Sequence, residues 1–109
     1  MNRELVVSPQ ASHDEDEISL YLAQNAGEAT ALRFLDAVRD TYQQLTTMPG
    51  MGTRVTGLRG SRLQDLRRWQ IRGFTMYLVF HRADSEFVQI VRVLHGSRDI
   101  MAILEDEEA

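Results

Sequence analysis

A histidine and an arginine stand close together near the end of the chain, in the stretch Arg92–Ile100 (RVLHGSRDI). An imidazole accepts and donates protons near neutral pH, and a guanidinium stabilises developing negative charge. His95 and Arg98 could therefore form part of a catalytic centre. The alternative is structural: His95 closes an apolar strand, Gly96 makes a bend, and Ser97 caps a following helix. The residue types leave both interpretations open.

Other arrangements that carry chemistry find little support. His13 lies among four carboxylates at a predicted helix start, and His81 closes a strand, so both are expected at structural or exposed positions. No two histidines have the spacing of metal ligands, and neither a phosphate-binding GK[ST] motif nor a GxSxG nucleophile motif occurs. The chain has no cysteine, which excludes disulfides and thiolate metal sites. We expect no metal and no cofactor.

Arginine is the most distinctive residue type, because all twelve basic residues are arginine. Residues 1–48 hold three arginines against eight acids, residues 49–98 hold nine against three, and residues 99–109 hold five acids alone. Guanidinium groups make planar, bidentate contacts with carboxylates and phosphates. A basic centre between acidic ends predicts a polar binding face on the central segment. We assign the following residues to this partner-binding face: Arg67, Arg68, Arg72, Arg92, His95 and Arg98.

Strand geometry predicts how these side chains are distributed. Arg67 and Arg68 are adjacent, so they should point to opposite faces of a strand. Arg68 and Arg72 are four residues apart, so they should share a face if the strand is regular. Arg92 is expected to point to the face opposite the two valines that flank it.

The first half of the chain predicts the elements that support this face. Residues 3–7 have the composition of a short strand. Ser8-Pro9 then reads as a helix start, with serine as the cap and proline at the first helical position. This helix should end near residues 25–27, where glycine follows asparagine and alanine. A second helix is predicted over residues 28–47, because its apolar residues recur at helical spacing. The two helices should form a hairpin.

The second half predicts strands. Leu63–Ile71 is an arginine-rich strand whose register the pattern does not fix, and Phe74–Phe80 is strongly β-prone. A polar turn joins it to the strand Phe87–Leu94, so these two form an antiparallel hairpin. A short helix follows at about Arg98–Leu104, and the acidic residues 105–109 should be frayed. The order β-α-α-β-β-β predicts an α+β fold in two layers, with the helical hairpin on one face of a mainly antiparallel sheet that ends in a three-stranded meander.

The bulk properties bound the organisation. A length of 109 residues allows one small domain, residues 1–109. The N-terminus lacks the apolar run of a secretory signal, and no apolar run approaches the ~18 residues of a membrane span. We therefore expect a cytoplasmic protein.

The chain resembles the RelE/ParE superfamily of toxins from type II toxin–antitoxin modules, on its ParE-like branch. The resemblance covers nearly the whole chain, from about Leu5 to Leu104. The following residues carry it, in chain order: Ser8–Ala11, Ile18, Tyr21, Ala31, Phe34, Leu45, Pro49–Gly52, Arg67–Trp69, Gly73–Phe80 and Val93–Asp99. The resemblance also implies the β-α-α-β-β-β order.

The activity that the resemblance implies depends on the branch. RelE-like toxins cut messenger RNA on the ribosome with a cluster of basic residues and commonly a C-terminal tyrosine, whereas ParE-like toxins inhibit DNA gyrase and are not nucleases. Thr75 stands where the nuclease branch tends to carry an arginine, no tyrosine follows Arg98, and the chain has no lysine. Only Arg98 matches a catalytic arginine of the nuclease branch. These departures favour the gyrase-inhibiting branch.

The resemblance thus predicts a toxin that inhibits DNA gyrase by protein–protein contact, not an enzyme. It also implies a ParD-like antitoxin as partner in a heteromeric complex, with operator DNA bound only through the antitoxin. An alternative is a ribosome-dependent ribonuclease with His95 as base and Arg68 and Arg98 as charge stabilisers. A further alternative is a module that binds antitoxin without being toxic.

Overall fold

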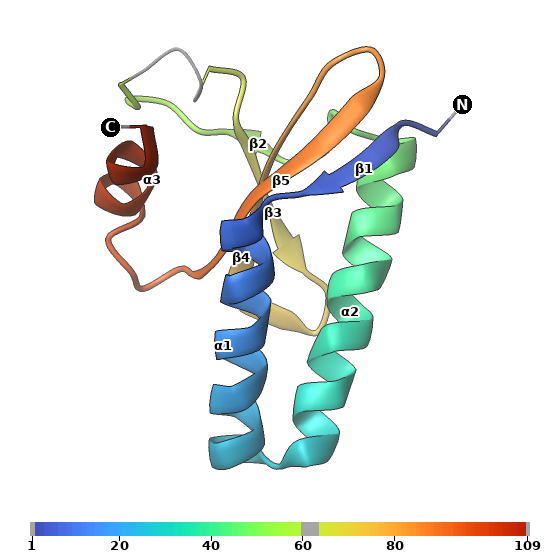
Figure 1. Ribbon diagram of the computed structural model, residues 1–109, viewed down its shortest axis with the longest axis vertical. Helices are drawn as coiled ribbons and strands as arrows, with labels where there is room; N and C mark the ends of the chain where they lie inside the picture. Colours follow the sequence, from blue (N-terminus) through green and yellow to red (C-terminus); the bar gives the residue numbers. More distant parts are fainter. Residues whose placement is uncertain (1, 60–63, 109) are drawn as a thin grey trace.

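Local sequence signals set the first two helices, α1 (Pro9–Ala26) and α2 (Glu28–Thr47), where the sequence predicts them. The structure is a computed structural model that describes residues 2–59 and 64–108. The Ser8 hydroxyl oxygen accepts a hydrogen bond from the Ala11 amide at 3.0 Å, which caps α1. Gly27 joins the helices with a φ of 95°, a conformation that favours glycine. The result is an antiparallel hairpin (Figure 1).

Five strands form one sheet in the order β1-β5-β4-β3-β2. β1 pairs in parallel with β5, and the other three pairs are antiparallel. The strands are β1 (Glu4–Val7), β2 (Thr53–Arg54), β3 (Arg67–Ile71), β4 (Phe74–Ala83) and β5 (Phe87–His95). This arrangement confirms the predicted α+β fold and its meander, and adds the two-residue strand β2, which no sequence pattern predicted. β3 is shorter than predicted, because it begins at Arg67; the predicted start, Leu63, lies outside the described residues.

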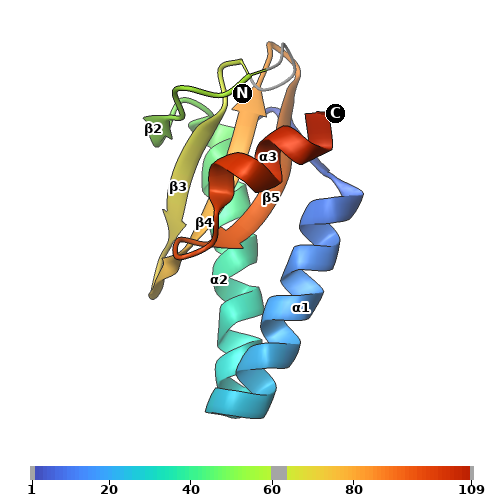
Figure 2. The same ribbon diagram turned by 90° about the vertical axis from the view of Figure 1, so that its left-hand side faces the viewer.

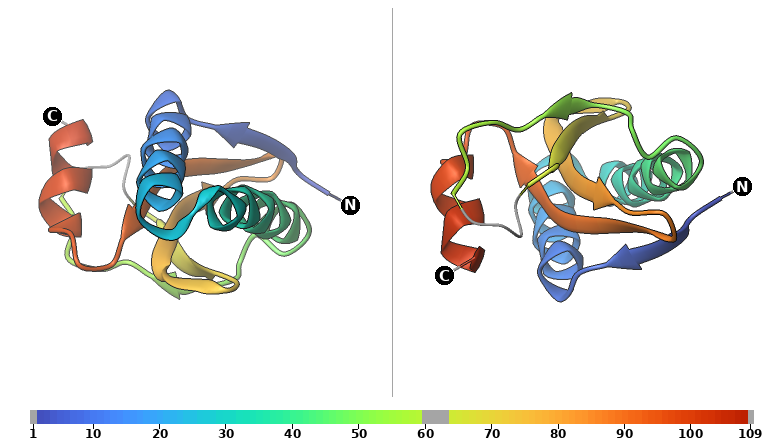
Figure 3. Two further views of the ribbon diagram at one scale, coloured as in Figure 1. Left: turned by 90° about the horizontal axis from the view of Figure 1, so that it is seen from below. Right: turned by 90° about the horizontal axis from the view of Figure 1, so that it is seen from above.

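Two apolar clusters lie on opposite faces of the sheet. The hairpin covers one face, where Phe34, Leu45 and Val79 are fully buried. On the other face, Leu104 of the last helix, α3 (Ile100–Glu108), packs with Phe80 and other apolar residues. Figure 2 shows α3 crossing β4 and β5 with α2 behind them, and Figure 3 shows α3 standing apart from the hairpin. Two long helices therefore cover one face of the sheet, and the short helix α3 packs on the other.

The last helix differs from its prediction. It begins at Ile100 rather than near Arg98, and it runs to Glu108 through residues predicted to be frayed. Asp99, not Ser97, caps it, because the Asp99 carboxylate accepts from the Ala102 amide at 3.3 Å. The Glu105 carboxylate accepts from the Arg59 amide at 2.9 Å. These contacts stabilise the helical conformation of the acidic C-terminal segment.

An irregularity in β5 overturns one prediction about its side chains. The β4–β5 register shifts between Phe80 and His81, so that Val91 is an extra residue on β5. Val93 consequently packs in the cluster under the hairpin, whereas Val91 packs in the cluster under α3. The prediction that these two valines share a face, with Arg92 opposite both, is wrong, because strict alternation fails at a bulge.

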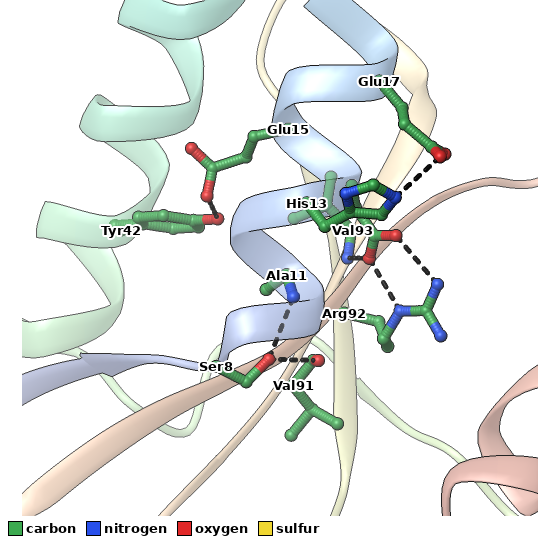
Figure 4. A network of polar contacts seen from close by, with 10 residues as sticks. Ser8, Ala11, His13, Glu15, Glu17, Tyr42, Val91, Arg92 and Val93 are labelled. Carbon is green, nitrogen blue, oxygen red and sulfur yellow. Dashed lines mark hydrogen bonds and ion pairs between the residues drawn. The ribbon is translucent and has the colours of Figure 1, made fainter.

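Among the described strands, none lies beside the second half of β5 on the β1 side, because β1 pairs only with Phe87–Ile90. Side chains at the start of α1 hydrogen-bond the backbone groups along this edge instead (Figure 4). The Ser8 hydroxyl donates to the Val91 carbonyl at 2.8 Å, and the Asp14 carboxylate accepts from the Val93 amide at 3.0 Å. Arg92 completes the contact with two hydrogen bonds to Asp14, at 2.7 and 2.8 Å.

This ion pair is nearly dry, since the Asp14 and Arg92 side chains are 5% and 12% exposed. Replacing Asp14 by asparagine should remove the charge that neutralises Arg92 and destabilise the protein by about 3 kcal/mol. Asp16→Asn, an exposed change on the same helix, should cost less than about 0.5 kcal/mol. Urea unfolding followed by circular dichroism would measure both, and equal midpoints for the two variants would contradict the role given to this pair.

His81 is the second buried polar group with structural consequences. Its side chain is fully buried, and neither ring nitrogen makes a hydrogen bond to any residue that the structure describes. Burial lowers its pKa to about 4; the nearby Met51 backbone opposes this shift, and the Arg67 charge adds to it. The ring is therefore neutral in the folded protein at physiological pH.

The lowered pKa of His81 should make folding sensitive to acid. The unfolded ring, with a pKa near 6.5, binds a proton more readily than the folded ring. Its stabilising contribution is full above pH 6.5 and should fall by about 3 kcal/mol as the pH drops to 4. His81→Leu should remove this share of the pH dependence. Unfolding curves for both proteins at pH 7, 5 and 4 give the comparison, and parallel pH profiles would disprove the assignment.

Candidate partner-binding site

A groove of about 390 Å³ opens between α1 and the end of β5. We call it the α1 groove. It is lined by one face of α1, by Tyr77 of β4, and by the chain that leaves β5: Asp14, Glu17, Ile18, Tyr21, Tyr77, Val93, Leu94, His95, Ser97 and Arg98. The buried contact of Asp14 with β5 holds the two walls at their spacing, because it joins α1 to the strand that carries His95.

His95 is fixed at the end of the α1 groove by its own turn. The Ser97 amide donates to Nδ1 of His95 at 3.0 Å, and the Ser97 hydroxyl lies 2.7 Å from the same nitrogen. An amide can only donate, so Nδ1 accepts and the neutral ring carries its proton on Nε2. The ring also stands edge-on to Tyr77, with centroids 5.1 Å apart. In this conformation the neutral ring presents no free lone pair to a substrate, so His95 serves as a wall of the groove.

Two tyrosines form the remaining aromatic wall. Tyr77 packs edge-on against the buried Phe34, with centroids 5.4 Å apart, and burial raises the pKa of its hydroxyl. Tyr21 stands on the rim and is 58% exposed. In the sequence, Tyr21 and Tyr77 were recognised only among the residues that carry the family resemblance, and neither was assigned to the binding face. The sequence signal that could have identified these two residues was one aromatic residue in a predicted helix and another in a predicted strand.

The charged residues of the α1 groove differ in how firmly they are held. Glu17 pairs with His13 at 2.8 Å, but both side chains are more than 60% exposed, so this contact contributes little. Arg98 is exposed at the end of the groove and makes no side-chain hydrogen bond or ion pair with the part of the chain that the structure describes. Its guanidinium is available to a carboxylate.

Arg98 also borders a second cavity, of about 430 Å³, on the α3 side of the sheet. Arg68 of β3 and Arg54 of β2 line the same cavity. We call it the arginine pocket. The structure thus brings together three of the predicted residues, His95 and Arg98 in one cavity and Arg68 and Arg98 in the other.

The other predicted residues lie elsewhere. Arg92 is held by Asp14, and Arg67 is partly buried, donating to the Gly52 carbonyl at 3.1 Å. Arg72 follows the end of β3 and lines a separate cavity beside α2. It does not share a strand face with Arg68, because the strand stops at Ile71 and its register shifts there. We therefore leave these three arginines out of the proposed site.

Within the described residues, no group of histidines and carboxylates has an arrangement that could hold a metal ion. No described helix is long and apolar enough to cross a bilayer. What the site offers is an aromatic groove and a pocket of guanidinium groups, joined at Arg98.

The fold agrees with the toxin family that the sequence resembles. A family model for the ParE toxin of the type II toxin–antitoxin system parDE matches residues 5–100. The chain belongs to this ParE toxin family, which confirms the predicted membership.

A solved structure supports the fold. The chromosomal ParDE TA system from P. aeruginosa contains a chain that superposes with a TM-score of 0.68 at 18% sequence identity. The match covers 85% of the present chain and 95% of that chain. No curated protein sequence matches the chain.

Proposed function

We propose that this chain is the toxin of a type II toxin–antitoxin pair, that a ParD-like antitoxin binds it in the α1 groove, and that its target is DNA gyrase. The family match over residues 5–100 carries the proposal. The groove adds the physical support, because it combines apolar and aromatic walls with one exposed guanidinium.

The α1 groove suits an amphipathic segment of a partner. Ile18, Tyr21 and Tyr77 offer apolar surface for hydrophobic anchors, and tyrosine is enriched where protein interfaces are most tightly held. Arg98 at the end would pair with an acidic residue of that segment. The basic balance of residues 49–98 would attract an acidic partner over a longer range.

Truncating the rim of the groove tests the antitoxin assignment. Tyr21→Ala should weaken binding of the cognate antitoxin by about tenfold, because an exposed tyrosine would become a buried contact in the complex. Leu32→Ala removes an equally exposed apolar side chain from α2, outside the groove, and should change the Kd less than twofold. Isothermal titration calorimetry on both variants gives the comparison; an equal loss in the two would place the antitoxin elsewhere.

Gyrase is favoured as the target over the ribosome by the state of His95. A metal-independent ribonuclease needs a base, an acid and a cation for the developing charge. Nδ1 of His95 is occupied by Ser97, and Thr75 on β4 is an exposed, uncharged residue where a nuclease would carry an arginine. Inhibition by protein–protein contact requires none of these groups.

A supercoiling assay decides between the targets. Protein freed of antitoxin, added to gyrase and relaxed plasmid, should inhibit supercoiling and accumulate linear DNA from trapped cleavage complexes. Adding the antitoxin first should restore supercoiling, which controls for contaminating nuclease. Full gyrase activity in the presence of well-folded protein, together with cleavage of messenger RNA on ribosomes, would replace this proposal with the ribonuclease alternative.

A further inference from the structure

The arginine pocket is a second surface of the molecule, on the opposite face of the sheet from the helical hairpin. Three guanidinium groups border it, from Arg54, Arg68 and Arg98. Arg54 pairs with Asp65 at 2.7 Å in an exposed contact. Arg68 and Arg98 make no side-chain hydrogen bond or ion pair with the described residues. One acidic residue, Asp99, also lines the pocket, and its carboxylate accepts from the Ala102 amide at the start of α3. The arginines still outnumber the acid in this lining, so an added carboxylate between Arg68 and Arg98 would be favoured.

The fold holds these two arginines in place through their backbone. Arg68 lies opposite Phe80 in the β3–β4 register, and Phe80 is fully buried beneath α3. The Arg98 amide donates to the His95 carbonyl at 3.1 Å, in the turn that leads to α3. Both side chains therefore project from ordered backbone next to an apolar core.

The rest of the lining indicates what kind of anion fits. Val55, Ile100 and Met101 give the arginine pocket apolar walls beside the guanidinium groups. A free phosphate or a nucleic-acid backbone would leave these walls unused. The acidic helix α3 stands beside the pocket, and the chain carries a net charge of −4. These negative charges would repel a polyanion as dense as nucleic acid far more strongly than a peptide with one or two carboxylates and an apolar side chain.

We propose that the arginine pocket binds a carboxylate-bearing, extended segment of the same antitoxin that occupies the α1 groove. Arg98 lines both cavities, so a segment leaving the groove passes directly into the pocket. Arg68 and Arg98 bind its carboxylate, and the apolar walls take a neighbouring side chain. This inference rests on the proposed antitoxin partner and extends its contact to the second face of the sheet.

Charge-neutral variants test the pocket in the full-length protein. Arg68→Gln and Arg98→Gln should each weaken antitoxin binding by about fivefold to tenfold, the size expected for a partly exposed charge-assisted hydrogen bond. Arg39→Gln removes one positive charge from the exposed surface of α2 and should change the Kd less than twofold. The loss should shrink as salt is raised, because the contact is electrostatic. Equal effects of Arg68→Gln and Arg39→Gln would overturn the inference.

A peptide probe separates failure of the pocket from failure of the antitoxin assignment. A labelled peptide in which glutamate alternates with serine around a central leucine should bind the wild-type protein more tightly than its glutamine counterpart, by fluorescence anisotropy. This preference should vanish in the Arg68→Gln, Arg98→Gln double variant. No preference for the glutamate peptide would reject the pocket even if the antitoxin binds. If a single-stranded oligonucleotide binds the pocket more tightly than the peptide, the ligand is a phosphate and the inference is wrong.

Discussion

The buried contact of Asp14 with Arg92 and the Val93 amide determines how the two halves of this small domain fit together. β1 covers only the first part of β5, so the remaining edge of the strand must be satisfied by other groups. Ser8 and Asp14 provide them from the start of α1. Side chains, rather than another strand, satisfy this edge. The space between α1 and the end of β5 is therefore not filled by a strand, and the α1 groove can form there.

The bulge at Val91 changes which side chains of β5 point to each face of the sheet. An additional residue there sends Val91 toward α3 and Val93 toward the hairpin, so one strand contributes to two separate apolar clusters. It also brings Arg92 within reach of Asp14. His81 lies at the same register shift on β4, buried and without a hydrogen bond to the described residues. The irregularity therefore lies beside two buried polar groups, His81 on β4 and the Asp14–Arg92 pair on β5.

Local signals explain why most of the fold could be predicted and the site only in part. The Ser8 cap, the Gly27 junction and the β-prone runs act within a few residues, and the elements lie close to where these signals place them. The position of the Arg92 side chain depends on Asp14, which is 78 positions away in the sequence. It also depends on a bulge that no local pattern in the sequence predicts. β2 exists because Gly52, with a φ of 97°, lets the chain approach the Arg68 carbonyl. The predicted arginine face was therefore divided by tertiary contacts.

The α1 groove and the arginine pocket meet at the turn His95–Arg98, so one short segment of the chain contributes to both surfaces. His95 faces the α1 groove, Arg98 borders both cavities, and Asp99 starts α3. Among the described residues, the buried cluster beneath α3 is smaller than the one under the hairpin, so we expect α3 to be the less stable layer. A partner that contacts both sides of the turn would tie α3 to the hairpin. Its binding free energy would then add to the stability of the fold as well as to that of the complex.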